Sequence, residues 1–388
     1  MIICVYSIQI LKLTIIKKVQ HKKFNFETMK RIGLVLSNTL NVSPYVKYFT
    51  TVFDRNNISY NIICWNRNNF PIEREDNIIC FDYTSLEGAK PIEKLKDYYK
   101  FGEFVKQHVK SQYDYLVVFD VASAFFIYSF LKKQFKNKYI LDIRDHSPLI
   151  TPLKLTGMLR KIIGLSSLTT ISSEGYKEWL PKNEKYVLSH NFNLLLIDEM
   201  PTNHASPFSS DKTNIVTVGV IREFDENKRL IDNCSTDINY SVSFVGYGSE
   251  YDNLKLYSSK LNNVFFLGRY NKNDEREIVM NYDLINLIHP DNLHCNTAMS
   301  NRFYMCLMYK RPLIVNKSSV HSMYVSKYNL GVVVEANDDI VSKIELFKKD
   351  FDYEKFVISC NFVLNLIKDE QILFENKVEQ FIKNSRNI

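Results

Sequence analysis

The chain has 388 residues, enough for two or three domains, and 45% of them are apolar, so it can bury sizeable cores and is not a disordered protein. Its 11 glycines are few against an average usage of about 7%. This scarcity excludes collagen-like and Gly/Ser-linker sequences and argues against glycine-rich phosphate loops. The formal net charge is +7 without a dense run of Lys and Arg among aromatics, so nucleic acid is not an expected partner.

The first 28 residues differ from the rest of the chain. Residues 1–16 are mostly apolar but are interrupted by Gln9 and Lys12, and they are too short to cross a bilayer comfortably. They also lack the basic leading segment and the cleavage site of a signal peptide. At Met29 the sequence changes to one typical of an opening β-strand. We therefore interpret 1–28 as a non-native or disordered extension, which N-terminal sequencing of the natural protein would test.

The seven cysteines are scattered and include no Cys-x-x-Cys pair. Cysteines in such apolar contexts are typical of small buried side chains in a reducing compartment. The sequence therefore predicts neither a disulfide framework nor a metal site.

From Met29 onward, short β-branched or aromatic runs alternate with amphipathic stretches, which indicates parallel βαβ units. Prolines and small polar residues interrupt this alternation over 193–212, and 353–383 is predicted to form one or two helices. The predicted strands are Ile32–Leu36, Tyr60–Cys64, Ile78–Phe81, Tyr115–Phe119, Tyr139–Ile143, Leu168–Ser172, Tyr186–Ser189, Ile215–Val218, Val242–Val245, Val264–Leu267, Leu284–Ile288, Leu313–Val315 and Val332–Val334.

This organisation predicts an α/β protein of two consecutive Rossmann-like, doubly wound domains with a ligand in the cleft between them. The first domain is expected over 29–200 and the second over 213–365, with 201–212 as the linker. Residues 366–388 are expected to form a C-terminal helix that packs toward the first domain.

Three glycines of the second half follow predicted strands. Gly219 ends one strand, and Gly246 and Gly248 form a Gly-x-Gly after the next. Tight turns at such positions let backbone amides approach a phosphate, although a lone Gly-x-Gly is also common in turns that bind nothing.

Two arginines of the second half are candidates to bind an anion. Arg222 lies just past the domain's first strand, where its planar fork of donors can hold a diphosphate. Ser300, Asn301 and Arg302 open a predicted helix over 301–309, whose amides and dipole suit an anion. The alternative for both arginines is a solvated surface charge.

In the first half, charged residues follow the strand Tyr139–Ile143 directly. Asp145 and His146 lie in this segment, and such positions after a parallel strand often hold active-site groups. We therefore choose Asp145 and His146 as candidate catalytic residues.

Several segments of the second half, in order and spacing, resemble the family 4 (group 1) glycosyltransferases of the GT-B fold, as found in bacterial surface-polysaccharide loci. They are Ile215–Gly219, Ser243–Glu250, Asn263–Arg269, Ser300–Tyr304 and Arg311–Val315. The resemblance implies a nucleotide-sugar donor held by the second domain and an acceptor held by the first. It also implies retention of anomeric configuration without metal or cofactor, and a final helix that crosses back. In this family an acidic or histidine residue near the transferred sugar often occupies the place of Asp145 and His146.

The chain also departs from the family pattern. The usual pair of glutamates would fall at Thr297 and Met305, so ribose recognition must differ or be lost. The usual arginine and lysine align with Val220 and Asp225, which leaves Arg222 as a displaced substitute.

The resemblance predicts a cytoplasmic glycosyltransferase of surface-polysaccharide or capsule biosynthesis. Its donor would be a nucleotide-sugar, UDP-linked by base rate, and its acceptor a saccharide or a lipid-linked saccharide. One alternative is a catalytically degenerate GT-B protein that binds a nucleotide-sugar or a partner glycosyltransferase. Another is a nucleotide-sugar epimerase, which would need a set of catalytic carboxylates in the cleft.

A peripheral contact with the inner face of the cell membrane is a further expectation. Residues 152–163 form a basic amphipathic pattern that would suit anionic lipid. The competing interpretation is a helix that packs on its own sheet.

Overall fold

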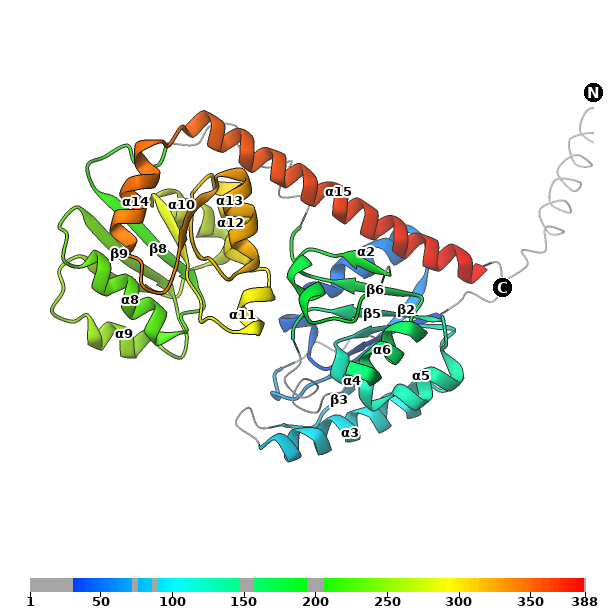
Figure 1. Ribbon diagram of the computed structural model, residues 1–388. Coiled ribbons are helices and arrows are strands. Elements are labelled where there is room, and N and C mark those ends of the chain that lie inside the picture. The colour runs from blue at the N-terminus through cyan, green and yellow to red at the C-terminus, as the bar shows by residue number, and fades with distance from the viewer. Residues whose placement is uncertain are drawn as a thin grey trace, which may run out of the picture.

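The computed structural model describes residues 31–71, 76–85, 90–146, 156–183, 185–193 and 206–386, so the predicted extension 1–28 lies outside it. The described chain forms two α/β domains joined along one side by a long helix (Figure 1). This arrangement confirms the predicted fold class.

The first domain is built on a parallel sheet of seven strands in the order β3-β2-β1-β4-β5-β6-β7. The chain changes direction across the sheet between β1 and β4, which makes this pair a topological switch point. Side chains alternate between two cores because both faces of the sheet are covered. The strands are β1 (Arg31–Leu36), β2 (Ser59–Trp65), β3 (Ile78–Phe81), β4 (Tyr115–Phe119), β5 (Tyr139–Ile143), β6 (Leu168–Ile171) and β7 (Tyr186–Leu188).

The helices of the first domain divide between these two faces. One face is covered by α2 and the final helix, and the other by α3, α4, α5 and α6. A 3-10 helix, η1, precedes α2, and another, η2, follows β6. Their bounds are η1 (Leu40–Val42), α2 (Val46–Arg55), α3 (Pro91–Val109), α4 (Val121–Phe126), α5 (Tyr128–Gln134), α6 (Thr156–Leu165) and η2 (Glu174–Glu178).

The second domain repeats the design with six parallel strands in the order β10-β9-β8-β11-β12-β13. Its switch point lies between β8 and β11. The strands are β8 (Thr213–Gly219), β9 (Tyr240–Gly246), β10 (Val264–Gly268), β11 (Leu284–Leu287), β12 (Leu313–Asn316) and β13 (Gly331–Val334). The helices are α8 (Phe224–Cys234), α9 (Tyr251–Tyr257), η3 (Lys272–Asp274), α10 (Glu275–Met280), α11 (Leu293–Thr297), α12 (Asn301–Tyr309), α13 (Val320–Tyr328) and α14 (Ile340–Lys349).

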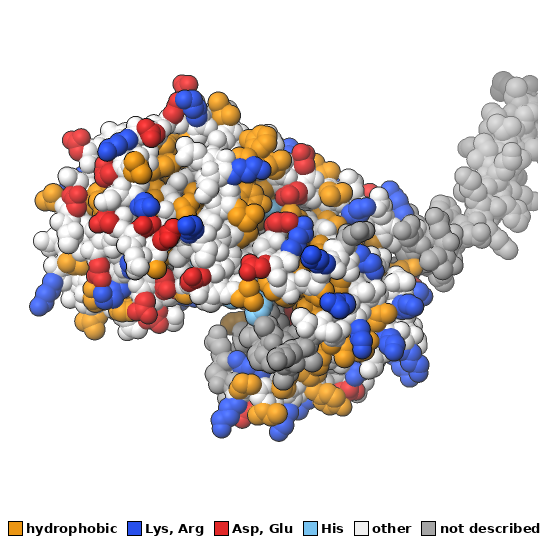
Figure 2. All heavy atoms as spheres, in the orientation of Figure 1, with side chains coloured by type: hydrophobic (Ala, Val, Ile, Leu, Met, Phe, Trp, Pro, Cys, Tyr) orange, Lys and Arg blue, Asp and Glu red, His pale blue; other side chains and the backbone are white. Residues whose placement is uncertain are grey.

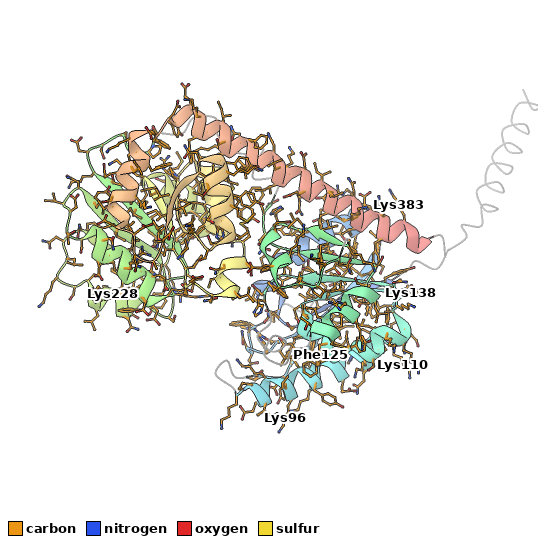
Figure 3. All side chains as sticks on the ribbon, viewed as in Figure 1. Lys96, Lys110, Phe125, Lys138, Lys228 and Lys383 are labelled. Atoms are coloured by element: carbon orange, nitrogen blue, oxygen red, sulfur yellow. The ribbon has the colours of Figure 1, made fainter. Side chains whose placement is uncertain are left out.

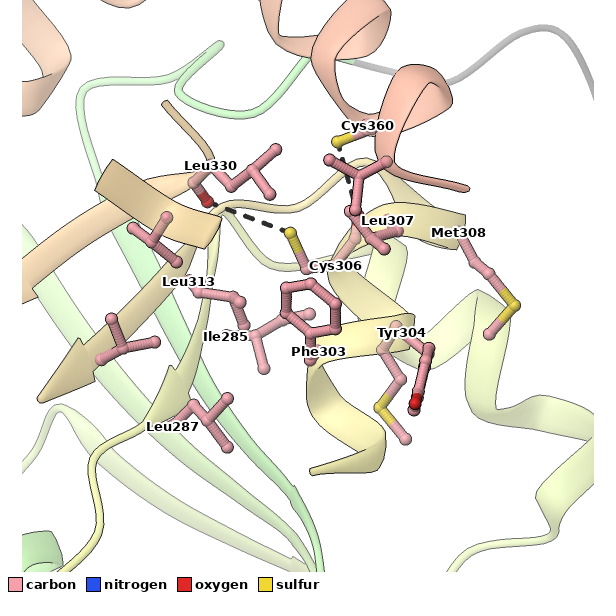
Figure 4. Packing of buried hydrophobic residues seen from close by; sticks show 14 of the residues in the cluster. Ile285, Leu287, Phe303, Tyr304, Cys306, Leu307, Met308, Leu313, Leu330 and Cys360 are labelled. Carbon is pink, nitrogen blue, oxygen red and sulfur yellow. Dashed lines mark hydrogen bonds between the residues drawn. The ribbon is translucent and has the colours of Figure 1, made fainter. Parts of the chain in front are cut away.

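The final helix, α15 (Tyr353–Arg386), belongs to both domains. In the second domain Cys360 packs beside Cys306 of α12, over a core that contains Ile285 and Leu313 (Figure 4). Further along the same helix, Phe374 is fully buried in the first domain. One uninterrupted helix of 34 residues therefore completes a core in each domain (Figure 1).

The junction between the domains is held by His190, which follows β7. Its Nδ1 lies 2.9 Å from Tyr304 Oη of α12, and its Nε2 lies 2.7 Å from Glu370 Oε2 of α15. Its backbone N–H donates to Gln371 Oε1 at 3.1 Å. The His190 side chain is buried, so these bonds fix the end of the first domain against two elements at once.

We expect His190→Ala to lower the free energy of unfolding by about 1–3 kcal/mol, because it deletes the buried hydrogen bond to Tyr304 Oη and the partly buried one to Glu370. Urea unfolding followed by circular dichroism would measure the change. His108→Ala is the matched control, because the half-buried His108 bonds and packs on Phe104 of its own helix and makes no contact between domains among the described residues, so its loss should cost less than about 0.5 kcal/mol. Equal losses in the two variants would contradict the assigned role of His190.

The segment proposed for membrane contact is described from residue 156 onward, as helix α6. Its Leu159, Ile162 and Ile163 are buried in the core of the first domain, as the competing interpretation expects. Arg160 and Lys161 remain exposed. Among the residues that the structure describes, no helix is both long enough and apolar enough to span a membrane.

Candidate functional site

The carboxyl ends of the two sheets face one another where the domains meet. Asp145 follows β5 of the first sheet, and the charges of Arg222 and His294 from the second domain act on its carboxyl group. Figure 2 shows a hollow between the domains with histidine atoms on its wall. Ligands of open α/β sheets bind at this edge, so the hollow is the candidate site.

Arg302 is the central cation of the second wall. Its Nε donates to the carbonyl oxygen of Val218 at 2.7 Å, and its Nη2 donates to that of Val220 at 3.2 Å. Its Nη1 lies 3.4 Å from the carbonyl oxygen of Asn286 at the end of β11. These carbonyls place the guanidinium at the switch point between β8 and β11. Burial lowers the pKa of Arg302 to about 10, so it remains charged at neutral pH.

Other cations and imidazoles gather around Arg302. Burial, together with Arg302, His321, His294 and Arg222, lowers the pKa of His289 to about 3. Arg222 is exposed at the mouth of the site, so its binding of a diphosphate stays a prediction beside the alternative of a solvated surface charge. Because a pKa of about 3 leaves His289 neutral at pH 7, the positive charge here comes from Arg302 and Arg222, whose guanidinium groups suit a diphosphate.

Glu223 directly follows Arg222 in the sequence and is an acid among these positive groups. Burial raises its pKa, and Arg222 and Arg302 oppose that shift. Its backbone is left-handed, with φ of 54° and ψ of 79°, at the start of α8. Such strain in a residue other than glycine is concentrated at functional sites.

The three candidate glycines hold two loops against each other. Gly246 has φ of +131°, and a Cβ there would lie 1.8 Å from the carbonyl oxygen of Gly219. A Cβ on Gly248 would lie 2.2 Å from the carbonyl oxygen of Ile221. The loops after β8 and β9 therefore touch through backbone, which explains glycine at these positions without a ligand. Gly219 itself has φ of +98° and open space where a side chain would be.

The predicted helix start at 301 agrees with α12, which begins at Asn301 with Ser300 as its N-cap. Ser300 Oγ accepts from the backbone N–H of Arg302 at 3.3 Å. The Ser300 N–H donates to Nε2 of the buried His321 at 3.0 Å, so the imidazole must keep this nitrogen unprotonated. Burial lowers the pKa of His321 to about 3. Asn301 is exposed in the first turn.

The pKa of His321 makes stability depend on pH. An unfolded histidine titrates near 6.5, so the folded state loses stability as pH falls from 6.5 toward 3. From pH 7 to pH 5 we expect His321 to cost about 2 kcal/mol. In His321→Gln, whose amide oxygen can accept from Ser300 and does not titrate, this part of the loss should disappear. Urea unfolding at both pH values measures it, and an unchanged pH dependence in the variant would contradict it.

Asp145 and His146 occupy the facing wall. Asp145 opens to solvent, but the surrounding protein removes much of its hydration and raises its pKa, against the opposing effects of His294, Arg144 and Arg222. Burial lowers the pKa of His146, whose ring packs edge-on against Trp179 with centroids 5.1 Å apart. A carboxyl group and a neutral imidazole thus stand side by side across from Arg222.

Arg144, the residue before them, is structural. Its Nε donates to Asp142 Oδ2 at 2.6 Å, and its Nη1 donates to the carbonyl oxygen of Ser189 at 2.7 Å. Nη1 also reaches Asn191 Oδ1 at 3.0 Å. This buried guanidinium ties the end of β5 to the segment that leaves the first domain.

Asp120 is a further acid at the cleft edge of the first sheet that the sequence patterns did not single out. It follows β4 at the switch point of the first sheet, where Ser37 Oγ donates to its Oδ2 and the Ser123 N–H donates to its Oδ1 at 2.6 Å. Burial raises its pKa, and its backbone has φ of 77° and ψ of 151°. The signal available in the sequence was an acid directly after a buried strand, as at Asp145.

The two positions where the family carries glutamates are occupied by packing residues. Thr297 is buried, and its carbonyl oxygen accepts from Ser173 Oγ of the first domain at 2.6 Å. Met305 is 5% exposed and lies in the core of the second domain. Neither side chain can therefore bind a ribose in this arrangement.

Asp225, at the usual lysine position, lines a pocket of about 550 Å³ at the carboxyl ends of β11, β12 and β13. The pocket also contains His289, so it adjoins the electropositive cluster. It is lined by Asp225, Glu226, Arg229, Ile288, His289, Asp291, Asn316, Lys317, Ser318, Val334, Glu335 and Ala336. Within the described ranges, no group of three or more His, Cys, Asp or Glu residues could hold a metal ion.

The overall architecture is similar to that of several solved structures. A sucrose-phosphate synthase from Thermosynechococcus elongatus superimposes with a TM-score of 0.62 at 14% identity, over 92% of this chain and 98% of that one. The lipopolysaccharide outer core galactosyltransferase WaaB gives 0.61 at 14% identity, over 92% and 99%. The Anabaena protein HepE, in complex with UDP and glucose, gives 0.61 at 13% identity, over 92% and 100%. The chain has the GT-B fold.

No protein-family model and no curated protein sequence matches the chain. The likeness to GT-B structures therefore concerns the fold and its two facing domains.

Proposed function

We propose that the protein is a glycosyltransferase that moves a sugar from a nucleotide-sugar to a saccharide or lipid-linked saccharide acceptor. The observation that carries the proposal is the electropositive switch point of the second sheet. There Arg302 rests on three backbone carbonyls, next to Arg222 and His289 and opposite Asp145 and His146. A diphosphate leaving group requires this kind of fixed positive environment.

The chemistry assigns a task to each wall. The bond between the anomeric carbon and the diphosphate oxygen breaks, and its electron pair stays on the diphosphate, where Arg302 and Arg222 neutralise the charge. The acceptor hydroxyl oxygen bonds the same carbon on the face that the diphosphate leaves, and its proton passes to the departing diphosphate oxygen. Asp145 and His146, on the opposite wall, are placed to contact the positive sugar, which the Asp145 carboxylate stabilises. We propose retention of configuration without a metal, in line with the family 4 resemblance.

Two structural neighbours support the choice of donor. HepE was solved with UDP and glucose, and a protein from E. coli with UDP-2-fluoro glucose. We accordingly propose a UDP-sugar as donor. For the pathway we propose surface-polysaccharide or capsule biosynthesis on the cytoplasmic side of the membrane, with peripheral contact to it.

A second proposal is a degenerate GT-B protein that binds a nucleotide-sugar or a partner glycosyltransferase without catalysis. The packing roles of Thr297 and Met305 favour it, because both family glutamates are replaced by residues turned into the protein.

A thermal-shift panel of UDP, GDP, CDP and their sugars tests both proposals, because a ligand that binds the folded state raises Tm. We expect one nucleoside diphosphate to raise Tm, and the rise to vanish in Arg302→Met but not in the surface control Lys255→Met. Release of that nucleotide from its sugar in the presence of saccharide acceptors then separates the proposals. Binding without transfer to any acceptor supports the degenerate protein, and a panel without any shift contradicts both.

A further inference from the structure

The first domain carries a basic outer face on the side covered by α3, α5 and α6. Residues 90–110, 128–138 and 156–165, which form these helices and their ends, contain twelve Lys or Arg and three acids. Residues 206–352 of the second domain contain 17 Lys or Arg and 19 Asp or Glu. Figure 2 shows the blue atoms gathered at the outer edge of the first domain. The charge of the molecule is therefore concentrated on one face of one domain.

Lys96, Lys110 and Lys138 mark the extent of this basic face (Figure 3). All three are exposed, and none has a carboxylate partner within ion-pair distance among the described residues. One acid of the face, Asp97, is buried and accepts from Ser85 Oγ. Another, Glu103, is paired with Lys106. Most of the positive charge therefore remains available to a partner.

Exposed apolar side chains stand among these lysines on α3. Ile92 is 59% exposed and Tyr99 is 58% exposed, and Lys96 lies between them on the same helical stripe. A solvated helix has no need of an isoleucine and a tyrosine at these positions. Apolar and aromatic side chains set among lysines are typical of a surface that lies in the headgroup region of a membrane.

The direction of α3 relates this face to the cleft. The helix follows the carboxyl end of β3 and runs back toward the amino end of β4. Ile92 therefore lies near the cleft edge of the sheet, and Lys110 lies at the far end. A flat partner along α3 would extend from the outer end of the first domain to the edge of the cleft (Figure 1).

We propose that this basic face docks the protein on an anionic lipid bilayer. The lysines bind the negative headgroups, and Ile92 and Tyr99 enter the interface beside the cleft. The docking surface differs from the apolar side of α6, which is buried in the core. If the protein is the proposed glycosyltransferase, docking would also present a lipid-linked acceptor to Asp145. This consequence rests on the proposed function, whereas the docking does not.

Sedimentation of the full chain with vesicles tests the proposal. We expect binding to phosphatidylcholine vesicles that contain 30% phosphatidylglycerol, about tenfold weaker binding at 0.5 M NaCl, and none to phosphatidylcholine alone. The triple variant Lys96→Glu, Lys110→Glu, Lys138→Glu should lose at least tenfold in affinity. Ile92→Ser with Tyr99→Ser should lose the residual binding at high salt.

The control is Lys255→Glu, Lys260→Glu, Lys349→Glu, which changes the charge equally at exposed sites of the second domain and should bind as the original chain does. Equal losses in the two triple variants would overturn the proposal, as would binding to neutral vesicles. Preference for a double-stranded RNA over the anionic vesicles would also overturn it. Nucleotide thermal shifts of the same variants separate this outcome from failure of the proposed function, because the basic-face variants should keep them.

Discussion

Replacing Arg302 with methionine should weaken binding of the cognate nucleoside diphosphate by at least about a hundredfold. Hydrogen bonds to a charged group contribute about 1.5–3 kcal/mol each, so removing one bidentate pair of bonds to the diphosphate accounts for that factor. The three carbonyls of Val218, Val220 and Asn286 hold the guanidinium in place before any ligand arrives, so its loss cannot be replaced by a neighbouring side chain. Isothermal titration calorimetry with the nucleotide chosen by the thermal-shift panel would measure the effect.

Arg302→Lys separates charge from geometry, because the ammonium keeps the charge but cannot span the same three carbonyls. We expect it to recover part of the affinity. Arg222→Met, at an exposed position, should lose less than Arg302→Met. If Arg302→Met binds the nucleotide as the original chain does while its unfolding curve is unchanged, the site has been assigned to the wrong edge of the sheet.

Gly246→Ala should destabilise the second domain by more than about 4 kcal/mol. A Cβ at this position would meet the carbonyl oxygen of Gly219 at 1.8 Å, and the backbone φ of +131° is itself unfavourable for alanine. Backbone lies on both sides of the contact, so no flexible side chain can move away. Urea unfolding would measure the loss, or soluble expression would report it if the variant does not fold.

Gly164→Ala is the matched control, since a Cβ there meets nothing within 4 Å and Gly164 lies in helix α6. Alanine in an exposed helix should raise stability by about 0.5–1 kcal/mol. A loss at Gly164 comparable to that at Gly246 would mean that the crowded loop contact is not the cause.

The strands could be predicted from the sequence because parallel strands are buried on both faces. Tyr115–Phe119 and Tyr139–Ile143, for example, agree residue for residue with β4 and β5. A continuous β-branched and aromatic run needs no long-range information to be seen. The start of α2 is harder to predict. Ser43 followed by Pro44 is typical of an N-cap and a first helical position, but the N–H groups of Val46 and Lys47 bond only three residues back, and α2 begins at Val46.

The candidate site could be predicted only in part. Arg222, Asp145 and His146 lie just after strands and Arg302 lies in the first turn of helix α12, and these local patterns made them candidates whose roles stay predictions. His289 depends instead on which loops the sheet order brings together, and its sequence context of Ile and Pro resembles an ordinary loop. The candidate glycines lie at or just after strand ends, as the sequence predicts, and their role toward a donor stays a prediction. Their backbone contacts across the ends of β8 and β9 are visible only in three dimensions.

Helix α15 has a consequence for how the two domains unfold. Cys360 fills one core and Phe374 the other, so neither domain is complete without the same continuous helix. Stopping the chain before Phe374 would uncover the apolar face of the first domain, although that domain begins more than three hundred residues earlier. The two halves are therefore expected to melt in one cooperative transition. Each domain has its own sheet, but the two share a single free energy of unfolding.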